Sequence, residues 1–482
     1  MSVLSEFLHV VERFPDRTAI VDPLKTWTYI EVERSARRLA SAVQIQASSD
    51  KVGILLPTSG EFVYAYFACM IAGKVPVPIN FLLDPHQLEH IRGDAGLDLI
   101  ITCKPFEQKA EAMGGEIEVL EELDVLSLPE VNDSPVWEDS DLGTILYTSG
   151  TTGLPKGVML THGNFTSNVS ACRLLIGFST EDTTIGFLPL FHSFGLTATF
   201  LVPLLTGAKA VFLDRFHPGT AGEWIEREKV TILFAIPSMY RFFVLAAQKM
   251  ENDFSSLRLC ASGGEPLEDS LAEAFEQTFD FPLLNGYGLT ETSPVVAINL
   301  PHAPKPGSIG PPISGQEVRI VGEDGKSVPP GQDGELWLKG PNIMAGYLNL
   351  EEETRAVLDE DGWFRTGDQA RQDEDGYLYI TGRIKELIKS SGEYIVPYEI
   401  EQVIGTHPAV FEVAVIGIPD KSRGEVPKAF VSLKEGTDSS PDEIQALCRK
   451  ELARFKVPRE IEIRGQLPHG PTGKVLKRLL KE

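Results

Sequence analysis

The chain has 482 residues, of which 42% are hydrophobic and 23% charged, and its net charge is −25 at pH 7. This length predicts roughly three domain-sized units, and the composition is typical of a globular protein. The negative charge argues against nucleic acid as a partner, because a polyanion would be repelled outside any local basic patch.

The N-terminus and the cysteines bear on localisation. Residues 1–9 contain an early acid and no basic segment, so they do not predict a secretory signal. The cysteines show no C-x-x-C spacing and stand at positions 69, 103, 172, 260 and 448. This usage is typical of reduced thiols in a cytoplasmic protein. The longest uncharged apolar stretch, about residues 187–208, contains two prolines and a histidine, which argues against a membrane span.

Strand-like and helix-like runs alternate along most of the chain. The first strands are expected at residues 51–56, 75–79 and 98–102. A mostly buried helix is expected at residues 61–72, and a second αβ stretch covers residues 183–284. Such alternation favours layered α/β structure with largely parallel sheets. Residues 307–340 are rich in glycine, proline and alternating apolar residues, which suggests a small β-barrel-like unit.

A change of pattern near residue 381 predicts a domain boundary. A turn sequence at residues 373–376 and a strand at 377–380 precede it. Roughly a hundred residues with their own βαβ-like pattern follow it, including the apolar run 413–418.

Residues 148–157 are the most informative segment for chemistry. They read TSGTTGLPKG and combine three glycines, four hydroxyl side chains and one lysine. Glycine lets backbone N–H groups approach an anion, and the other side chains add donors and charge, so a phosphate-binding loop is expected. It is not a Walker A loop, because Pro155 and Gly157 stand where that motif needs Gly and Ser or Thr. Strand patterns at 143–147 and 158–160 place the loop between two strands.

Five further segments follow in a recognisable order. They are LPLFHSFG at 188–195, NGYGLTE at 285–291, GWFRTGD at 362–368, GRIKE at 382–386 and PTGK at 471–474. With the loop, they resemble the signature of the adenylate-forming superfamily, which includes acyl-CoA synthetases, coumarate:CoA ligases, luciferases and adenylation domains of nonribosomal synthetases. Within it, the chain is most similar to bacterial fatty-acyl-CoA or acyl-ACP synthetases.

The resemblance implies a fold and a reaction. The implied fold is α/β, with a large N-terminal domain of layered α/β subdomains and a β-barrel-like unit over residues 1–382. A hinge follows at 383–386, where Lys385 matches the hinge position, and a small mobile α+β lid domain covers 387–482. The implied reaction uses ATP and Mg²⁺ to convert a carboxylic acid to an acyl-adenylate. The acyl group then passes to coenzyme A, and AMP and pyrophosphate are released.

The implied nucleotide-binding residues fall in several motifs. In the loop they are Thr148, Ser149, Gly150, Thr151, Thr152, Gly153 and Lys156. In later segments they are Gly264, Glu265, Asn285, Gly286, Tyr287, Gly288, Thr290, Asp368 and Arg383. By resemblance, Tyr287 stacks on adenine. Asp368 and Arg383 bind the ribose, since one carboxylate accepts two hydrogen bonds.

The implied metal and catalytic residues are fewer. Glu291 resembles the magnesium ligand, since a hard cation favours carboxylate oxygen and shares its shell with phosphate. Thr290 resembles the contact to the α-phosphate. Lys474 resembles the lysine that bridges the α-phosphate and the substrate carboxylate, and Lys389 a second lysine that the lid presents in its other orientation. His192 is expected where the acyl pocket meets the adenylate.

The motif around His192 also limits the acid. Domains that activate α-amino acids place an aspartate there for the ammonium group, whereas this chain has Phe191 and Ser193 beside His192. An unpaired ammonium would lose its hydration at a high cost, so an acid without an α-amine is expected. A medium- or long-chain fatty acid is the main hypothesis. An aryl acid such as coumarate, and acyl carrier protein as acceptor, stay open. A non-catalytic nucleotide-binding protein would not need to keep Lys156, Glu291, Asp368 and Lys474.

His86 and His90 fit the H-x-x-E-H pattern of a zinc hydrolase helix. Asp84 and Pro85 precede them as an expected N-cap and first helical residue. No third ligand stands nearby in the sequence, so an ordinary amphipathic helix without metal is expected.

Overall fold

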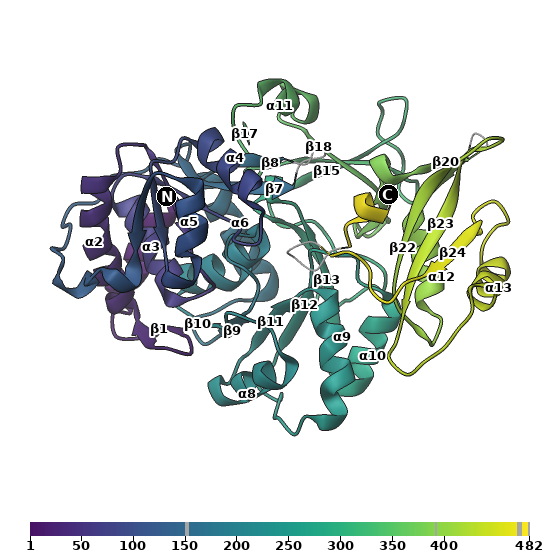
Figure 1. The fold of residues 1–482 in the computed structure, drawn as a ribbon, viewed down its shortest axis with the longest axis horizontal. Helices are drawn as coiled ribbons and strands as arrows, with labels where there is room; N and C mark the ends of the chain where they lie inside the picture. Colours follow the sequence, from purple (N-terminus) through teal and green to yellow (C-terminus); the bar gives the residue numbers. More distant parts are fainter. Residues whose placement is uncertain (150–153, 391–392, 470–474, 481–482) are drawn as a thin grey trace.

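The computed structural model describes residues 1–149, 154–390, 393–469 and 475–480, with only the backbone of Ser149 and Gln248. Figure 1 shows a large N-terminal part, coloured purple to green, and a small C-terminal part in light green and yellow. Both parts mix helices and strands, so the expected α/β class is confirmed.

The largest sheet has eight strands in the order β14-β13-β12-β11-β9-β10-β1-β2. The six inner strands are parallel, whereas β14 and β2 pair antiparallel at the two edges. The strands are β1 Thr18–Val21, β2 Thr26–Thr28, β9 Thr183–Gly186, β10 Lys209–Phe212, β11 Ile232–Ala235, β12 Leu259–Ser262, β13 Leu283–Gly288 and β14 Val295–Ile298. The helices around them are α1 Val3–Arg13, α2 Tyr29–Gln46, α6 His162–Ile176, α7 Val202–Thr206, α8 Pro218–Glu228, α9 Pro237–Ala246 and α10 Asp269–Phe279.

A second sheet of parallel strands has the order β4-β3-β5-β6. Its strands are β3 Lys51–Leu55, β4 Val75–Pro78, β5 Leu99–Thr102 and β6 Glu116–Val119, and its helices are α3 Gly60–Ile71, α4 Pro85–Ala95 and α5 Glu107–Met113. The expected strands and buried helix of this region are therefore confirmed. In α3 every residue except Glu61 is buried, as is typical of a helix that is apolar on all sides.

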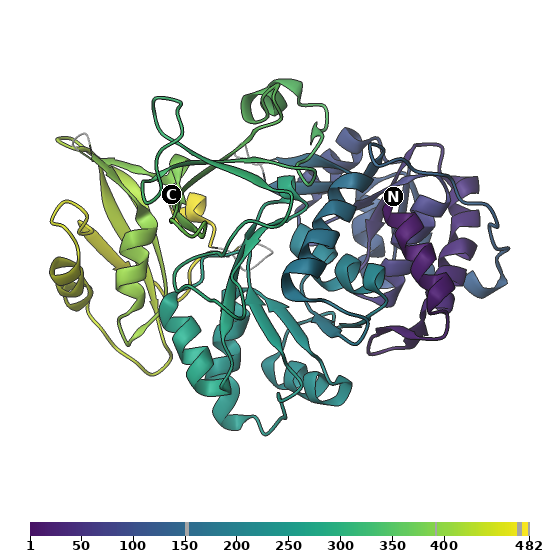
Figure 2. The same ribbon diagram turned by 180° about the vertical axis from the view of Figure 1, so that it is seen from behind.

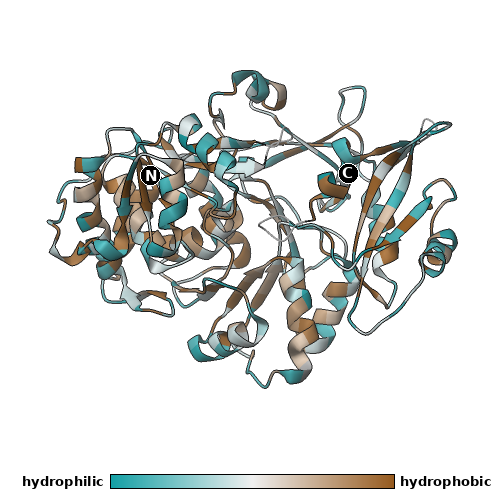
Figure 3. Cartoon of the chain, viewed as in Figure 1, coloured by the Kyte–Doolittle hydropathy of each residue, from teal (hydrophilic) through white to brown (hydrophobic). Residues whose placement is uncertain are grey.

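The interior of the N-terminal part is aromatic and aliphatic. Phe67 of α3 stacks on Phe7 of α1, with ring centroids 3.8 Å apart. Figure 3 shows hydrophobic strands inside and hydrophilic residues mainly on loops and outer helix faces. None of the helices in the described ranges is both long and apolar enough to cross a membrane.

A short antiparallel sheet and a larger one lie above the strands of the main sheet in Figure 1. The short sheet has the order β17-β8-β7, with β7 Leu142–Ser149, β8 Pro155–Thr161 and β17 Gly346–Tyr347. The larger sheet has the order β15-β16-β18-β19, with β15 Glu317–Val321, β16 Gly334–Lys339, β18 Phe364–Gln372 and β19 Leu378–Arg383. Helix α11 Glu351–Val357 connects the two. The expected strand–loop–strand arrangement around residues 148–157 is confirmed by the pairing of β7 with β8.

The C-terminal part is built on one sheet, in the order β21-β20-β23-β22 with β24 beside β23. Its elements are β20 Ile388–Ser390, β21 Glu393–Ile395, α12 Pro397–Gly405, β22 Val410–Asp420, β23 Gly424–Leu433, α13 Pro441–Glu451 and β24 Glu460–Ile463. The unit β23-α13-β24 is the βαβ crossover expected here. The run 413–418 is instead part of β22, which pairs antiparallel with β23, because the short connection after Asp420 cannot carry a crossover.

The amino ends of the main-sheet strands are fixed by a polar cluster. Asp182, just before β9, has a side chain only 4% exposed. It accepts hydrogen bonds from the Arg258 Nε at 2.7 Å and the Thr231 hydroxyl at 2.8 Å, which precede β12 and β11, and from the Ser179 N–H at 2.8 Å. Burial alone would raise the pKa of Asp182, but the bonds from Arg258, Ser179 and Thr231 outweigh it and leave the pKa below its ordinary value.

Asp182→Asn tests this cluster. The exchange leaves Arg258 without its charged partner, so we expect the free energy of unfolding to fall by about 2–4 kcal/mol at neutral pH. Because the pKa of Asp182 is depressed in the folded state, its contribution is present above the unfolded pKa and disappears as pH falls through the folded one. Urea unfolding at pH 7 and pH 3 measures both effects, and the variant should lose less stability on acidification than the wild type. An equal loss in both proteins would contradict this account.

Candidate active site

A cavity of about 1250 Å³ opens at the carboxyl ends of the main-sheet strands. Residues after β9, β12 and β13 line it, together with the β7–β8 hairpin, α11, β18 and the segment that joins β19 to β20. Open α/β sheets bind ligands at this edge. The charged side chains of the lining are balanced: the positive ones are Lys156, Arg365, Arg383, Lys385 and Arg478, and the acidic ones are Asp84, Glu291, Glu335, Glu353 and Glu386. Although the protein is acidic overall, the cavity thus offers cations to an anionic ligand.

Most residues predicted from the sequence lie in this cavity. Its lining includes Thr148, Lys156, His192, Gly264, Gly286, Tyr287, Gly288, Thr290, Glu291, Arg383 and Lys385. Asp368 is not part of the lining, but it contacts two lining residues, Tyr287 and Arg383. Glu265 and Asn285 are partly buried neighbours of the lining, and Lys389 lies away from it. Gly150, Thr151, Thr152, Gly153 and Lys474 lie outside the described residues, as does the side chain of Ser149.

The β7–β8 hairpin positions Thr148 and Lys156 opposite each other as cross-strand partners. Lys156 Nζ forms an ion pair with a carboxylate oxygen of Glu353 on α11 and lies 5.7 Å from the centre of the Tyr347 ring. The hairpin is also held from outside, because the His90 ring nitrogen Nε2 lies 3.0 Å from the Pro155 carbonyl oxygen.

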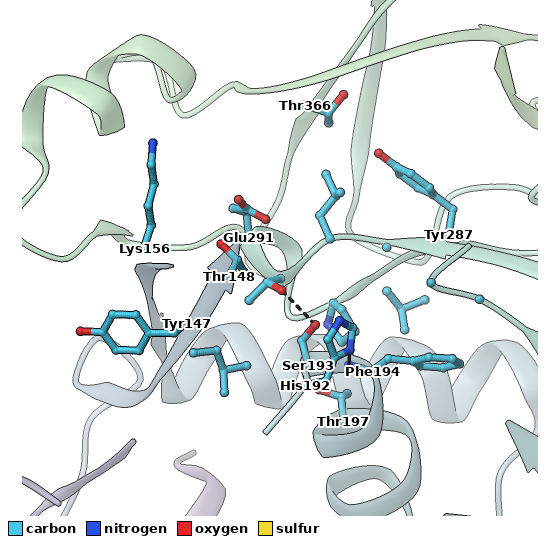
Figure 4. A pocket seen from close by; sticks show the side chains of 18 of the residues that line it. Tyr147, Thr148, Lys156, His192, Ser193, Phe194, Thr197, Tyr287, Glu291 and Thr366 are labelled. Carbon is cyan, nitrogen blue, oxygen red and sulfur yellow. Dashed lines mark hydrogen bonds between the residues drawn. The ribbon is translucent and has the colours of Figure 1, made fainter. Parts of the chain in front are cut away.

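Glu291 follows directly from β13. It lies in the 3₁₀ helix Thr290–Thr292, and its Oε1 accepts a hydrogen bond of 2.8 Å from the Tyr347 hydroxyl. Burial, reinforced by Glu291, raises the pKa of Tyr347, so its hydroxyl keeps the proton that it donates. One oxygen of Glu291 is thus fixed by Tyr347. In Figure 4 the carboxylate lies in the same part of the pocket as Lys156 and Thr148.

Tyr287, Asp368 and Arg383 form a second polar group. Asp368 and Arg383 are cross-strand partners on β18 and β19, and Arg383 Nε lies 2.8 Å from Asp368 Oδ1. The Tyr287 hydroxyl donates a hydrogen bond to Oδ2 of Asp368. Burial, together with the Asp368 charge, raises the pKa of Tyr287 well above its ordinary value. Burial would lower the pKa of Arg383, but Asp368 raises it overall. The Asp368 side chain is only 2% exposed, so two donors compensate its buried charge.

His192 lies at the start of a helical segment below these groups in Figure 4. Its Nδ1 accepts a hydrogen bond from the Phe194 N–H at 3.3 Å. The next residue, Ser193, lies 3.2 Å from the Thr290 hydroxyl. A π-helix Gly195–Leu201 follows, and a Cβ at Gly195 would come within 2.4 Å of the Pro189 carbonyl oxygen. Only glycine permits this close approach, and π-helical turns are common at functional sites.

Beyond His192 the cavity becomes apolar. The wall formed by α6, the π-helix and α7 presents Cys172, Ile176, Thr197, Ala198 and Val202. The opposite wall presents Phe234, Leu289, Pro294, Val295, Ala297 and Ile298. The Thr197 hydroxyl already donates to the Ser293 carbonyl at 3.1 Å, so it adds little polarity to the cavity. This part suits a hydrocarbon group.

The C-terminal part reaches the cavity through its last residues. Leu476 and Arg478 line it, close to Lys385 and Glu386 of the 3₁₀ helix Ile384–Glu386. Figure 2 shows the yellow 3₁₀ helix Lys477–Leu480 on the side of the C-terminal sheet that faces the main body. Lys389 is exposed, and its Nζ lies 5.6 Å from the centre of the Tyr394 ring.

Two lining residues, Tyr347 and Glu353, were not among the sequence-based candidates. Both are ordinary members of a strand and a helix in the sequence, and only their spatial contacts with Glu291 and Lys156 reveal them. Their positions depend on the pairing of β17 with β8.

Two segments concern metal binding. Among the described residues, no group of three or more His, Cys, Asp and Glu is arranged to hold an ion. Glu291 is a single carboxylate beside the expected phosphate-binding loop, which fits a magnesium ion that shares its shell with phosphate oxygens. The helix expected around His86 is confirmed: α4 begins with Asp84 as N-cap and Pro85 at its first position.

Comparison with known proteins agrees with the site. The sequence model of the family described as AMP-binding enzyme matches residues 7–348, and that of the AMP-binding enzyme C-terminal domain matches residues 399–474. A feruloyl-CoA synthase from Amycolatopsis is 37% identical over 476 residues, which cover 96% of this chain and 95% of the relative. A long-chain-fatty-acid–CoA ligase from Bacillus subtilis is 34% identical, covering 98% of this chain and 92% of the relative.

Solved structures give the same picture. ATP-bound MatB from Rhodopseudomonas palustris is 29% identical and superposes with a TM-score of 0.93, covering 100% of this chain and 98% of MatB. Apo MatB, with the same identity and coverage, gives a TM-score of 0.81. The arrangement of this chain is therefore more similar to the ATP-bound form.

Gly288 offers a test of how tightly the site segment is built. A Cβ at Gly288 would lie 2.2 Å from the Pro294 carbonyl oxygen, which is backbone and cannot move aside alone, whereas a Cβ at Gly286 meets nothing closer than 3.5 Å. We expect Gly288→Ala to lower the free energy of unfolding by about 1–3 kcal/mol. Gly286→Ala, two residues earlier in β13, should change it by less than about 1 kcal/mol. Thermal or urea unfolding of both variants is the measurement. Equal losses of stability in the two variants would contradict the tight approach of Gly288 to Pro294.

Proposed function

Because the chain belongs to the AMP-binding enzyme family, we propose that it is a fatty acid–CoA ligase acting on a medium- or long-chain acid. The coarser activity is that of an AMP-forming acid–thiol ligase: ATP and Mg²⁺ activate a carboxylic acid as its adenylate, and coenzyme A accepts the acyl group. The observation that carries the finer proposal is the apolar cavity wall of α6, the π-helix and α7.

The phosphate end of the substrate is proposed to lie by the β7–β8 hairpin. Lys156 would pair with the β- or γ-phosphate, with the loop residues from Thr148 to Gly153 as further donors. Glu291 would bind the magnesium ion through its carboxylate, oriented by Tyr347. Thr290, beside Ser193, would contact the α-phosphate. Positioning and cations carry such a reaction, because a carboxylate must approach an already anionic phosphate.

The nucleoside is proposed to lie between Tyr287 and the glycines around it. The Tyr287 ring offers a stacking face for adenine, with Gly264, Glu265, Asn285, Gly286 and Gly288 around it. Asp368 would accept the ribose hydroxyls, since its carboxylate is preorganised by Arg383 and Tyr287. His192, which lines the cavity, would then stand where the acyl chain meets the adenylate.

The acid is proposed to extend along the apolar wall. Cys172, Ile176, Ala198 and Val202 carry no charge that would hold a second carboxylate or an ammonium group. A phenolic hydroxyl buried there would also need a partner, since an unpaired polar group costs free energy. A hydrocarbon chain meets neither penalty. An aryl acid is the second candidate, because the feruloyl-CoA synthase relative is slightly more similar than the fatty-acid ligase.

Two further proposals concern the acceptor and the compartment. Coenzyme A is the acceptor of the related ligases, while acyl carrier protein is retained as an alternative acceptor to be tested. All five cysteines are free and buried, which supports a reducing compartment such as the cytoplasm.

A panel of acids tests the substrate proposal. We expect kcat/KM with coenzyme A to rise from acetate by roughly fourfold per added methylene until the cavity is filled, since each buried methylene contributes ~0.8 kcal/mol. AMP formation with acids from acetate to palmitate, benzoate, coumarate and ferulate is the measurement. Preference for ferulate or coumarate would favour the aryl candidate. Activity with acyl carrier protein but not with coenzyme A would show that acyl carrier protein is the acceptor.

A cavity variant sharpens the test. Ala198→Leu places a larger side chain on the apolar wall and should shift the preferred chain length toward shorter acids. Ala356→Leu makes the same exchange on α11, at the phosphate side of the cavity, and should leave the preference unchanged. The same shift in both variants would show that the apolar wall does not hold the acyl chain.

The C-terminal domain is proposed to act as a lid that rotates near Lys385, within the hinge 383–386. Leu476 and Arg478 line the cavity, which supports a role for Lys474 in adenylation. The greater similarity to ATP-bound MatB supports the same state. Lys389 lies outside the cavity, so it would reach the site only after a rotation for the thioester step.

Lys385→Pro tests this rotation. Proline fixes φ and removes an N–H, so we expect acyl-adenylate formation to stay within about threefold of wild type while thioester formation falls on the order of tenfold or more. Lys385→Ala removes the side chain without the backbone constraint and should retain both steps better. Single-turnover assays of each half-reaction are the measurement. Equal loss of both steps in a folded Lys385→Pro variant would contradict the hinge.

A further inference from the structure

Glu353 is the ion-pair partner of Lys156, the lysine that the proposed function assigns to phosphate binding. The Lys156 ammonium forms an ion pair with Glu353 Oε2, and both side chains line the cavity. The Lys156 side chain is 20% exposed and that of Glu353 is 40% exposed. The ion pair is therefore partly screened by solvent, and an incoming anion can reach the Lys156 ammonium.

The placement of Glu353 is fixed by the fold. Residues Gly346 and Tyr347 of β17 pair with Met159 and Val158 of β8, the same strand that carries Lys156. Helix α11 follows within a few residues. The Thr354 hydroxyl oxygen accepts from the Tyr347 N–H at 2.9 Å and so ties the helix to that strand. Glu353 and Lys156 are therefore linked through β17 and β8, and their contact does not involve the C-terminal part.

A second carboxylate lies close by. Glu291, proposed as the magnesium ligand, is hydrogen-bonded to Tyr347, whose ring centre lies 5.7 Å from Lys156 Nζ. Glu291 serves a cation, but Glu353 faces the ammonium that a phosphate would need. A phosphate and the Glu353 carboxylate would compete for the Lys156 ammonium, and the two negative groups would repel each other.

We propose that Glu353 is a positioning residue that competes with phosphate for Lys156. It holds the lysine side chain across the phosphate site when the site is empty, gives way when ATP binds, and takes the lysine back when pyrophosphate forms. The consequence is weaker binding of pyrophosphate and faster product release. This inference rests on the proposed phosphate role of Lys156.

The expected effect follows from charge. Glu353→Gln keeps the size of the side chain and removes the competing charge, so inorganic pyrophosphate should bind roughly 3- to 10-fold more tightly, the range for a partly exposed charge pair. The effect should be larger for pyrophosphate without Mg²⁺ than with it, because the ion neutralises part of the repelled charge. Glu352→Gln is the matched control, since it removes the same charge from the exposed neighbouring residue of α11.

Calorimetric titration of the full-length protein with inorganic pyrophosphate is the experiment, on Glu353→Gln, Glu352→Gln, Lys156→Met and the Lys156→Met/Glu353→Gln double variant. We expect Glu353→Gln to bind pyrophosphate more tightly than the wild type, and Glu352→Gln to bind it as the wild type does. In the Lys156→Met background, Glu353→Gln should no longer increase the affinity. An unchanged affinity of Glu353→Gln, with binding weakened by Lys156→Met, would overturn this inference and leave the proposed function intact. Equal tightening in both backgrounds would mean general repulsion and would also overturn it. Unchanged binding by Lys156→Met would remove the lysine from the phosphate site and the inference with it.

Discussion

The constraint on which the site depends is that six parallel strands of one sheet end at the same edge. The connections after β9, β12 and β13 therefore meet there, and each carries a motif of the proposed nucleotide site. The opposite edge contributes stability instead, because Asp182, Thr231 and Arg258 bind the starts of three strands to one another. The candidate active site thus lies at the carboxyl ends of these strands, and the stabilising polar cluster lies at their amino ends. The carboxyl ends can therefore carry glycines and a cavity.

Electrostatics is the second constraint. A protein of net charge −25 must bind a triphosphate, and in its cavity lining five cationic side chains offset five acidic ones. Three charged residues of the site also have an internal partner: Lys156 has Glu353, Arg383 has Asp368, and the Glu291 carboxylate has the Tyr347 hydroxyl. These partners hold the side chains in place without ligand. The cost is that a ligand anion must displace or share some of them, so affinity and preorganisation are balanced against each other.

Much of this could be predicted from the sequence, for physical reasons. The glycine-rich loop between two strands, the buried helix α3 and the capped helix α4 are encoded within a few residues of one another, and local patterns predicted them. Contacts between distant segments could not be predicted in the same way. Glu353 and Tyr347 reach the cavity only because β17 pairs with β8. Likewise, the run 413–418 looks like part of a βαβ unit, but the short turn after it makes the pairing antiparallel.

The contacts of Lys477 indicate where the proposed rotation takes place. Its Nζ lies 2.8 Å from Glu386 at the end of the 3₁₀ helix and 2.9 Å from Glu401 on α12. Burial would lower the pKa of Lys477, but Glu401 and Glu386 raise it, so the charge and both ion pairs are retained. These pairs tie the 3₁₀ helix Lys477–Leu480 to Glu386 and to α12. A rotation that preserves them would move Glu386 together with the C-terminal part, so the proposed pivot would lie in the residues just before it, where Lys385 lies.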